Sequence, residues 1–149
     1  MTPRLDFTVL SRAAPQGSKR HLGNGVMIES CKRVKPFRSD VRDVALSSTP
    51  TDWDLGLEYH LRADFHFRRP ASHLTSKGAL TKSAPLYPTG RQIGDTDKLL
   101  RALCDAMTGI VWFDDSQVID ITAKKRYFDR DQVIISITPV NVGTHQSTC

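Results

Sequence analysis

The sequence predicts a single α+β domain in which two main helices pack on a mixed β-sheet. Its 149 residues, 39% of them hydrophobic, are enough to bury one core. Several short segments alternate apolar and polar residues as strands do, and two longer segments repeat apolar residues at helical spacing. Mostly strands with two inserted helices indicate an α+β fold whose helices cover one face of the sheet.

The first third of the chain is predicted to form two strands and then a helix. Residues 5–10 alternate as a strand does, and residues 15–18, with Pro and Gly, break the pattern into a loop. Residues 23–25 (Gly-Asn-Gly) predict a tight turn, with a short strand at 26–29 returning from it. Apolar spacing then predicts a helix at 36–47, where the leading proline needs no amide hydrogen.

The middle of the chain contains the clearest strand pattern and a long loop. Residues 55–67 alternate throughout, and their apolar side carries Leu55, Leu57, Tyr59, Leu61, Ala63, Phe65 and Phe67. Residues 68–94 are rich in Pro, Gly, Ser, Thr and Lys and show no period. A connection of that length is usually functional or disordered, so we expect a long basic loop.

The last third is predicted to form a helix and three strands. The helix spans 96–107, with Asp95 or Thr96 as its cap and Gly109 as its stop. Strands are expected at 110–113, 118–127 and 132–140, each apolar or alternating. The tail at 143–149 is expected to be frayed. No internal repeat is visible, so we expect one domain over 1–149.

Basic residues are concentrated in two regions, and the formal net charge is +5. Residues 65–94 contain no acid at all, and residues 1–40 contain only three. This distribution favours an anionic partner such as DNA, although a solvated basic face gives the same pattern. The candidate DNA-binding residues are Lys19, Arg20, Lys32, Arg33, Lys35, Lys77, Lys82, Arg91 and Lys98.

The cysteines and the hydropathy pattern predict a soluble protein of a reducing compartment. Cys31, Cys104 and Cys149 are odd in number and lack the spacing of a zinc or redox motif, and no secretory leader precedes them. No apolar run approaches the roughly 20 residues that a membrane span requires. We therefore expect the cytoplasm as its location, that of a bacterial host if the protein is encoded by a phage.

Four aspartates flank the second predicted helix. Asp95 and Asp97 stand at its start, and Asp114 and Asp115 follow the apolar run at 110–113. A helix of about a dozen residues is roughly 18 Å long, and an antiparallel strand returning from it covers a similar distance. Both acidic pairs are then expected to meet at one end. Convergent carboxylates suit Mg²⁺, which can activate water for phosphodiester hydrolysis.

Each of these aspartates also has an ordinary structural interpretation. Asp95 is at a position that caps helices, and Asp97 is in a first turn where the helix dipole favours an acid. Asp114 and Asp115 are residues typical of turns. Spacing alone therefore leaves a metal site and a purely structural role both open.

The run from Gly94 to Tyr127, GDTDKLLRALCDAMTGIVWFDDSQVIDITAKKRY, resembles the RusA family of Holliday junction resolvases. That family has Asp-x-Asp-Asn at a helix start, a basic residue on its first turn and Asp-Ala-Leu near its end, followed by Asp-Asp-x-Gln-Val and a strand ending in Lys. The matching residues here are Asp95, Asp97, Arg101, Asp105-Ala106-Met107, Asp114-Asp115-Ser116-Gln117-Val118 and Lys125. Residues 14–19 are similar to the Pro-rich opening of phage members. Lys98 replaces the usual Asn, and Arg101 replaces the usual Lys.

The resemblance implies a homodimer that binds four-way DNA junctions and, with Mg²⁺ or Mn²⁺, makes paired symmetric nicks. It implies that Asp95, Asp97 and Asp115 hold the metal and that Asp114 assists them. Arg101 and Lys125 would then steady the scissile phosphate. Two other functions stay open: a magnesium nuclease for flaps, forks or single strands, and a basic DNA-binding module without catalysis.

Overall fold

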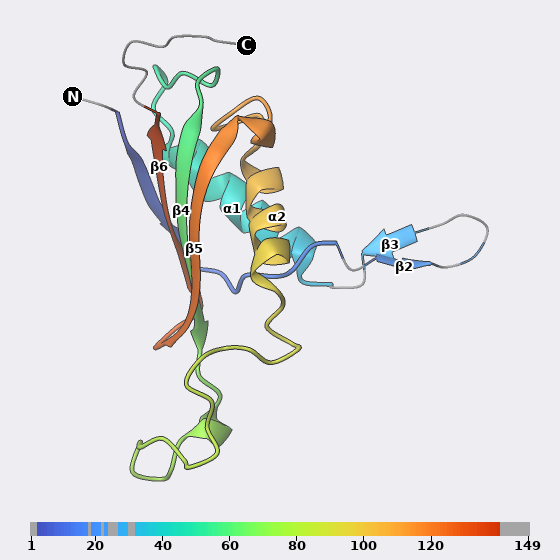
Figure 1. The fold of residues 1–149 in the computed structure, drawn as a ribbon, viewed down its shortest axis with the longest axis vertical. Coiled ribbons are helices and arrows are strands. Elements are labelled where there is room, and N and C mark those ends of the chain that lie inside the picture. Colours follow the sequence, from blue (N-terminus) through green and yellow to red (C-terminus); the bar gives the residue numbers. More distant parts are fainter. Residues whose placement is uncertain (1–2, 18, 22, 24–26, 30–31, 141–149) are drawn as a thin grey trace.

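A sheet of four strands forms the centre of the computed structural model, which describes residues 3–17, 19–21, 23, 27–29 and 32–140 (Figure 1). Its strand order is β1 (Leu5–Val9), β6 (Gln132–Pro139), β4 (Tyr59–Arg68) and β5 (Val118–Phe128). Strand β6 runs antiparallel to both β1 and β4, and β5 runs parallel to β4. The mixed sheet confirms the predicted α+β fold class.

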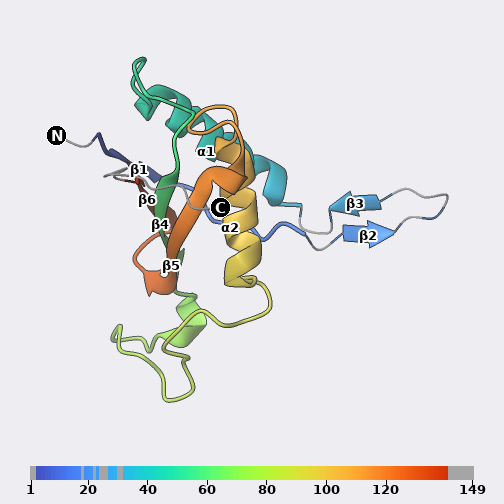
Figure 2. The same ribbon diagram turned by 45° about the horizontal axis from the view of Figure 1, so that its top comes forward.

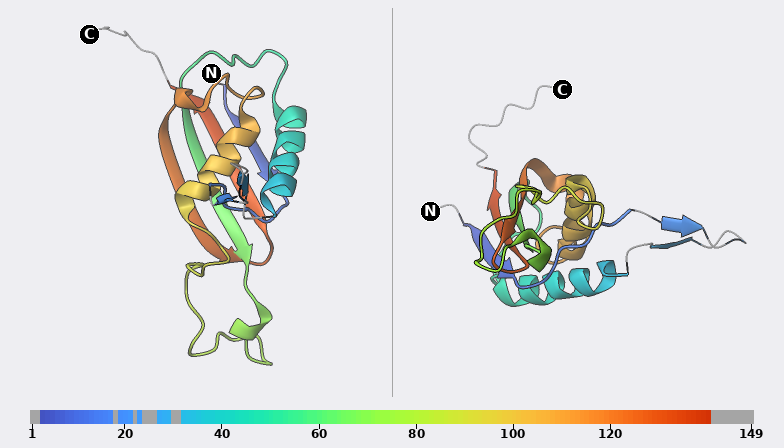
Figure 3. Two further views of the ribbon diagram at one scale, coloured as in Figure 1. Left: turned by 90° about the vertical axis from the view of Figure 1, so that its right-hand side faces the viewer. Right: turned by 90° about the horizontal axis from the view of Figure 1, so that it is seen from below.

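Two helices, α1 (Val34–Ser48) and α2 (Thr96–Met107), cover one face of this sheet (Figure 3). The alternation of β4 turns Leu61, Ala63 and Phe65 toward them, where all three are buried. Helix α1 begins two residues earlier than expected and keeps its proline in the first turn. Helix α2 has the predicted bounds, because its apolar residues form one continuous buried face.

A small hairpin of β2 (Lys19–His21) and β3 (Met27–Glu29) projects away from the sheet and helices (Figure 2). Strand β3 confirms the short strand expected at 26–29 for the residues that the structure describes. Strand β2 was not predicted, because its three polar residues show no alternation. The predicted turn falls partly, and the predicted frayed tail wholly, outside the described residues.

Strand β4 begins at Tyr59, so the prediction that the strand starts at Leu55 is wrong. Residues 55–57 form a turn instead, in which the Asp54 carboxylate accepts a hydrogen bond from the Gly56 N–H at 2.7 Å. Leu55 and Leu57 still pack against the core, each half-buried. The alternation of residues 55–57 therefore predicted their burial correctly. Their backbone forms a turn instead of a strand because the Asp54 side chain bonds the local main chain.

The prediction of a strand at 110–113 is also wrong, because these residues form a tight turn directly after α2. The Met107 carbonyl accepts hydrogen bonds from the N–H groups of Ile110 and Val111, both at 3.0 Å. Gly109 has a positive φ of 87° and donates its N–H to the Trp112 carbonyl at 2.7 Å. A short apolar run does not distinguish a strand from a buried turn, and here the glycine favours the turn.

Residues 69–94 form the expected long connection, which extends beyond the end of the sheet (Figure 1). Its regular structure is a 3-10 turn at Ala71–His73 and an isolated bridge between Leu74 and Leu80. Across the described residues, none of the helices is both long and apolar enough to cross a membrane.

Candidate active site

The start of α2 exposes two carboxylates. Asp95 is the N-cap residue, but its side chain makes no capping hydrogen bond, and Lys98 Nζ lies 3.9 Å from one of its oxygens. Asp97 is exposed in the first turn, where the helix dipole favours a negative charge. Both carboxylates therefore keep oxygen atoms available for an outside ligand.

The segment that follows β1 packs along the start of α2. The Gln16 N–H donates a hydrogen bond to the Lys98 carbonyl at 3.0 Å. Gly94 has a positive φ of 95°, and a Cβ built on it would lie 2.6 Å from the Pro15 ring. A Cβ on Gly17 would lie 2.6 Å from Arg101 Nη1, so the guanidinium of Arg101 rests against this segment. The Pro-Gln-Gly sequence thus fixes the surroundings of both Asp95 and Arg101.

Lys125 reaches the same end of α2 from the sheet. It lies on the helix side of β5, opposite Phe65 of β4, and is half-buried. Its ammonium donates a hydrogen bond to the Gly94 carbonyl at 3.0 Å, directly before Asp95. The structure therefore brings Lys125, Arg101, Asp95 and Asp97 to the start of α2.

The segment carrying Asp114 and Asp115 lies beyond the other end of α2 and is held by Gln117. The side-chain carbonyl of Gln117 accepts hydrogen bonds from the N–H groups of Phe113 and Asp114, at 3.0 and 2.9 Å. Its amide group donates to the carbonyls of Leu55 and Leu57, both at 2.7 Å. Asp114 accepts from the Ser116 N–H at 2.8 Å and completes a capping box with Gln117.

Three aromatic residues in contact anchor this segment to the sheet. The Tyr59 ring stacks on Trp53 at a centroid distance of 5.6 Å and contacts Trp112 in a tilted arrangement at 6.0 Å. The Trp53 indole N–H donates to the Val111 carbonyl at 2.8 Å. From α1, Arg42 donates to the Ala106 carbonyl at 3.1 Å, which satisfies one of the free carbonyls at the end of α2.

Asp105, near the end of α2, adds a third acid to this end. Its carboxylate accepts a hydrogen bond from the Gln16 side-chain amide. Desolvation raises the pKa of Asp115, and the charges of Asp114 and Asp105 raise it further. Hydrogen bonds from Ser116 instead lower the pKa of Asp114. Burial raises the pKa of the Cys104 thiol to about 12, with help from Asp115 and Asp105, so this cysteine stays protonated.

The two acidic pairs lie at opposite ends of α2 within one chain. The predicted return strand is absent, and a helix of 12 residues is about 18 Å long. Among the described residues, no three His, Cys, Asp or Glu side chains are grouped closely enough to hold a metal ion. The expected convergence of Asp95, Asp97 and Asp115 is therefore not present within a single subunit.

The sequence model of endodeoxyribonuclease RusA matches residues 12–138, which include all the acids and both basic residues of this site. The chain belongs to the RusA family. It is thus an enzyme that hydrolyses DNA internally, in a family whose activity is the resolution of Holliday junctions. A comparison with individual curated proteins gives no match.

The structure adds one contact to the site that the RusA sequence motif does not contain. In this contact the side-chain amide of Gln16 donates a hydrogen bond to Asp105. The sequence contained a signal for Asp105, because Asp97, Arg101 and Asp105 follow each other at intervals of four and share one helical face. It contained none for Gln16, which is 89 residues away from Asp105. Only the folded chain places the Gln16 amide beside Asp105, near the end of α2.

The predicted DNA-binding residues of this RusA member lie on several elements around α2. Lys19 and Arg20 belong to β2, and Arg33 donates to the Gln92 carbonyl at 3.0 Å, which ties the start of α1 to the loop before α2. Lys98 is half-buried beside Asp95. The remaining predicted residues are exposed on α1 or its approach and on the long loop: Lys32, Lys35, Lys77, Lys82 and Arg91.

Proposed function

We propose that this RusA enzyme is a magnesium-dependent homodimer that resolves Holliday junctions by paired nicks. The observation that carries the proposal is the family match over 12–138, since it spans every residue expected to act in catalysis. A four-way junction has approximate two-fold symmetry, and two nicks on opposing strands require two sites related by a matching axis. One chain of this size contains one copy of each acidic pair, so two chains are required. The cytoplasm, where DNA is accessible, would be its place of action.

The carboxylates provide oxygen atoms of the kind that a magnesium ion prefers. They would converge on one ion only if a second copy of the chain contributes to the site. Asp95, Asp97 and Asp115 are exposed oxygen ligands, which Mg²⁺ prefers and supplements with water and phosphate oxygens. If the α2 helices of two copies run antiparallel across a two-fold axis, Asp95 and Asp97 of one copy meet Asp115 of the other. Desolvation, followed by the charges of Asp114 and Asp105, raises the pKa of Asp115, and a cation beside it would stabilise its ionised form.

When bound, the ion would supply the means to polarise the scissile phosphate and to lower the pKa of a water molecule. The protein's own cations would hold the substrate. Arg101 presents a guanidinium that can bind two phosphate oxygens, and its position against Gly17 limits its rotation. Lys125, now bonded to the Gly94 carbonyl, adds a compact positive charge beside Asp95. Both charges would stabilise the negative charge that develops on the phosphate.

A panel of substrates tests this function. The purified protein is incubated with a four-way junction, a fork and a linear duplex, with and without Mg²⁺. We expect symmetric nicks in the junction with Mg²⁺ and none without it. Preferential cleavage of the fork would instead indicate a flap or fork nuclease, and binding without any cleavage would indicate a DNA-binding module.

Three charge-removing variants test the metal ligands within the same panel. Asp95→Asn, Asp97→Asn and Asp115→Asn are each expected to abolish cleavage while junction binding persists, because each removes an oxygen ligand and leaves the basic residues in place. Asp120→Asn is the matched control. Asp120 lies on β5, its carboxylate is 3.1 Å from His60 Nδ1 of β4, and it has no predicted role in catalysis. Near-normal cutting by all three variants would reject the site.

A further inference from the structure

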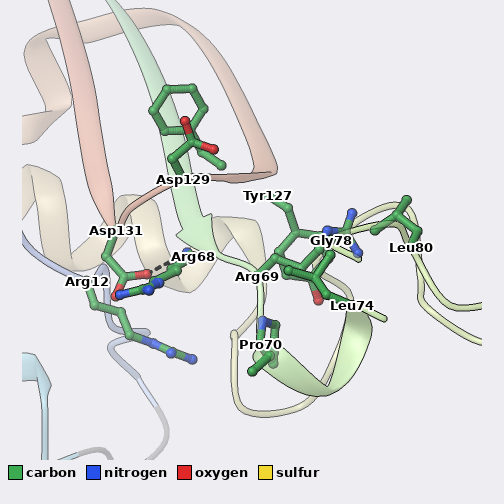
Figure 4. Close-up of a pocket in the computed structure, with 12 residues that line it drawn as sticks. Arg12, Arg68, Arg69, Pro70, Leu74, Gly78, Leu80, Tyr127, Asp129 and Asp131 are labelled. Atoms are coloured by element: carbon green, nitrogen blue, oxygen red, sulfur yellow. Dashed lines mark hydrogen bonds between the residues drawn. The ribbon is translucent and has the colours of Figure 1, made fainter. Parts of the chain in front are cut away.

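A pocket of about 850 Å³ lies where β4 and β5 end, between the sheet and the long loop (Figure 4). Arg12 and Arg68 lie on one side of it, and Tyr127, Leu74 and Leu80 lie on the other. Its volume is in the range that accommodates a small ligand the size of a nucleotide. Three arginines and two aspartates line it, namely Arg12, Arg68, Arg69, Asp129 and Asp131, so its lining carries a net positive charge.

Arg12 is the residue of the pocket whose interactions are incomplete. Its Nε is buried and has no hydrogen-bond partner, and its guanidinium lies 5.8 Å from the centre of the Phe67 ring. Asp131 lines the same pocket, and its carboxylate accepts a hydrogen bond from the main-chain N–H of Arg68 at 2.8 Å. A buried N–H group without an acceptor is costly, so an anion in the pocket that accepts a hydrogen bond from Arg12 Nε would be bound favourably.

The opposite wall of the pocket is apolar and firmly held. The Arg69 guanidinium lies 4.1 Å from the centre of the Tyr127 ring and donates to the Pro85 carbonyl at 2.7 Å, which fastens the loop over the sheet. Leu74 and Leu80 pair through a main-chain bridge and expose 39% and 47% of their surface. Because Arg69 already covers the Tyr127 ring, the exposed leucines are the apolar surface against which a nucleobase can pack.

The pocket is adjacent to the site at the start of α2. Tyr127 and Lys125 lie on the same face of β5, two residues apart, which corresponds to about 7 Å along a strand. Lys125 in turn contacts Gly94, the residue before Asp95. A DNA strand whose phosphate lies at Asp95 would therefore pass the pocket with a neighbouring nucleotide.

We propose that this pocket binds one unpaired nucleotide of the branched DNA, next to the bond that is cut. Arg12 and Arg68 hold its phosphate, and the leucines of the opposite wall pack against its base. The nucleotide must be unpaired, because a base within a duplex has both faces covered by its neighbours. This inference rests on the proposed function, and it adds a contact that selects branch points, where bases lose their stacking partners.

Binding of fluorescein-labelled oligonucleotides tests the pocket. Anisotropy is measured for a single strand and for a hairpin duplex of equal charge, with Arg12→Gln, Arg68→Gln and Leu80→Ser. Each arginine variant is expected to weaken single-strand binding about tenfold, the worth of one charged hydrogen-bonding contact. Leu80→Ser is expected to weaken single-strand binding but not duplex binding. Arg130→Gln is the matched control, because Arg130 is exposed in the connection between β5 and β6, next to the pocket residues Asp129 and Asp131, and does not line the pocket.

Two results would overturn the proposal. In one, Arg12→Gln and Arg68→Gln bind like Arg130→Gln. In the other, the affinities for single strand and duplex fall equally in all variants. That result would mean that the pocket residues contact only the phosphate backbone of DNA, whether paired or not. If Arg12→Gln does not fold, the exposed Arg68 carries the same test. Wild-type junction cleavage is measured separately. Normal cleavage together with pocket variants that bind like Arg130→Gln rejects this inference alone, and pocket-dependent single-strand binding without junction cleavage rejects the proposed function alone.

Discussion

Gln16, Gln117 and Lys125 each form a hydrogen bond with an acid of the site or with the main chain at or next to one. Gln16 reaches Asp105, Gln117 bonds the Asp114 N–H, and Lys125 bonds the carbonyl next to Asp95. At the scale of single residues, therefore, neutral amides and one ammonium position the carboxylates. None of these contacts requires the carboxylates to be neutralised, so the acids remain available to a cation.

Gln117 is expected to be the most sensitive of these positions for stability. Replacing it with Ala removes its hydrogen bonds to the Leu57 carbonyl and the Asp114 N–H, and leaves the Phe113 N–H and the Leu55 carbonyl only their 3.4 Å bond to each other. We expect the free energy of unfolding to fall by about 2 kcal/mol, in the range for partly buried polar groups that lose hydrogen bonds. Urea denaturation measures it. Gln92→Ala, at an exposed glutamine, serves as control, and an equally stable Gln117→Ala protein would show that these bonds contribute little.

Arg101 is expected to matter more for cleavage than for binding. A cation beside the reacting phosphate contributes most as charge develops in the transition state, so Arg101→Ala is expected to lower the cleavage rate about 100-fold. Junction affinity should fall by no more than about tenfold, the loss of one phosphate contact. Rate and affinity are measured on the same four-way junction. Equal losses would identify Arg101 as a docking residue only.

Among the elements, α2 was predictable and the turn after it was not. The helix has a cap position, a continuous apolar face and a glycine beyond its end, and each of these signals is local. Residues 110–113 have no such signal, because four apolar residues fit a buried strand and a buried turn equally well. The position of Asp115 depended on that choice. For this reason the sequence identified the acids of the candidate site but misjudged their arrangement in one chain.

The sheet contains one histidine that predicts a pH effect on stability. Burial, followed by the charge of Arg126, lowers the pKa of His66, whose ring is hydrogen-bonded to Gln132 at 2.9 Å. The folded chain therefore binds this proton more weakly than the unfolded chain does. The contribution of the neutral His66 ring to the free energy of unfolding is complete at pH values above 6.5, the ordinary pKa of histidine. It is lost as the pH falls below 6.5 toward the lowered pKa of the folded state.

Replacing His66 by Gln removes this titration and keeps an amide partner for Gln132. We expect the free energy of unfolding of the wild type to fall from about pH 7 to about pH 5, and the fall to be smaller in His66→Gln. Urea denaturation at several pH values provides the comparison. Identical pH dependence in both proteins would mean that another group dominates.

At the scale of the whole molecule, the proposed metal site joins acids from the two ends of α2 and therefore predicts an assembly of two chains. Sedimentation at micromolar concentration is expected to give a homodimer, and a stable interface should bury on the order of 1,600 Å² in total. A strictly monomeric species, both free and on the junction, would contradict paired nicking. It would instead favour a nuclease that acts on flaps or single strands.

Mixed dimers test the shared metal site most directly. Asp97→Asn and Asp115→Asn chains are each expected to be inactive alone. In a mixed dimer with one chain of each kind, one shared site has lost both ligands and the other is intact. Co-refolding the two variants should therefore restore nicking of one junction strand, to on the order of a quarter of the wild-type level for random mixing. A mixture as inactive as its two parents would contradict a site built from two subunits.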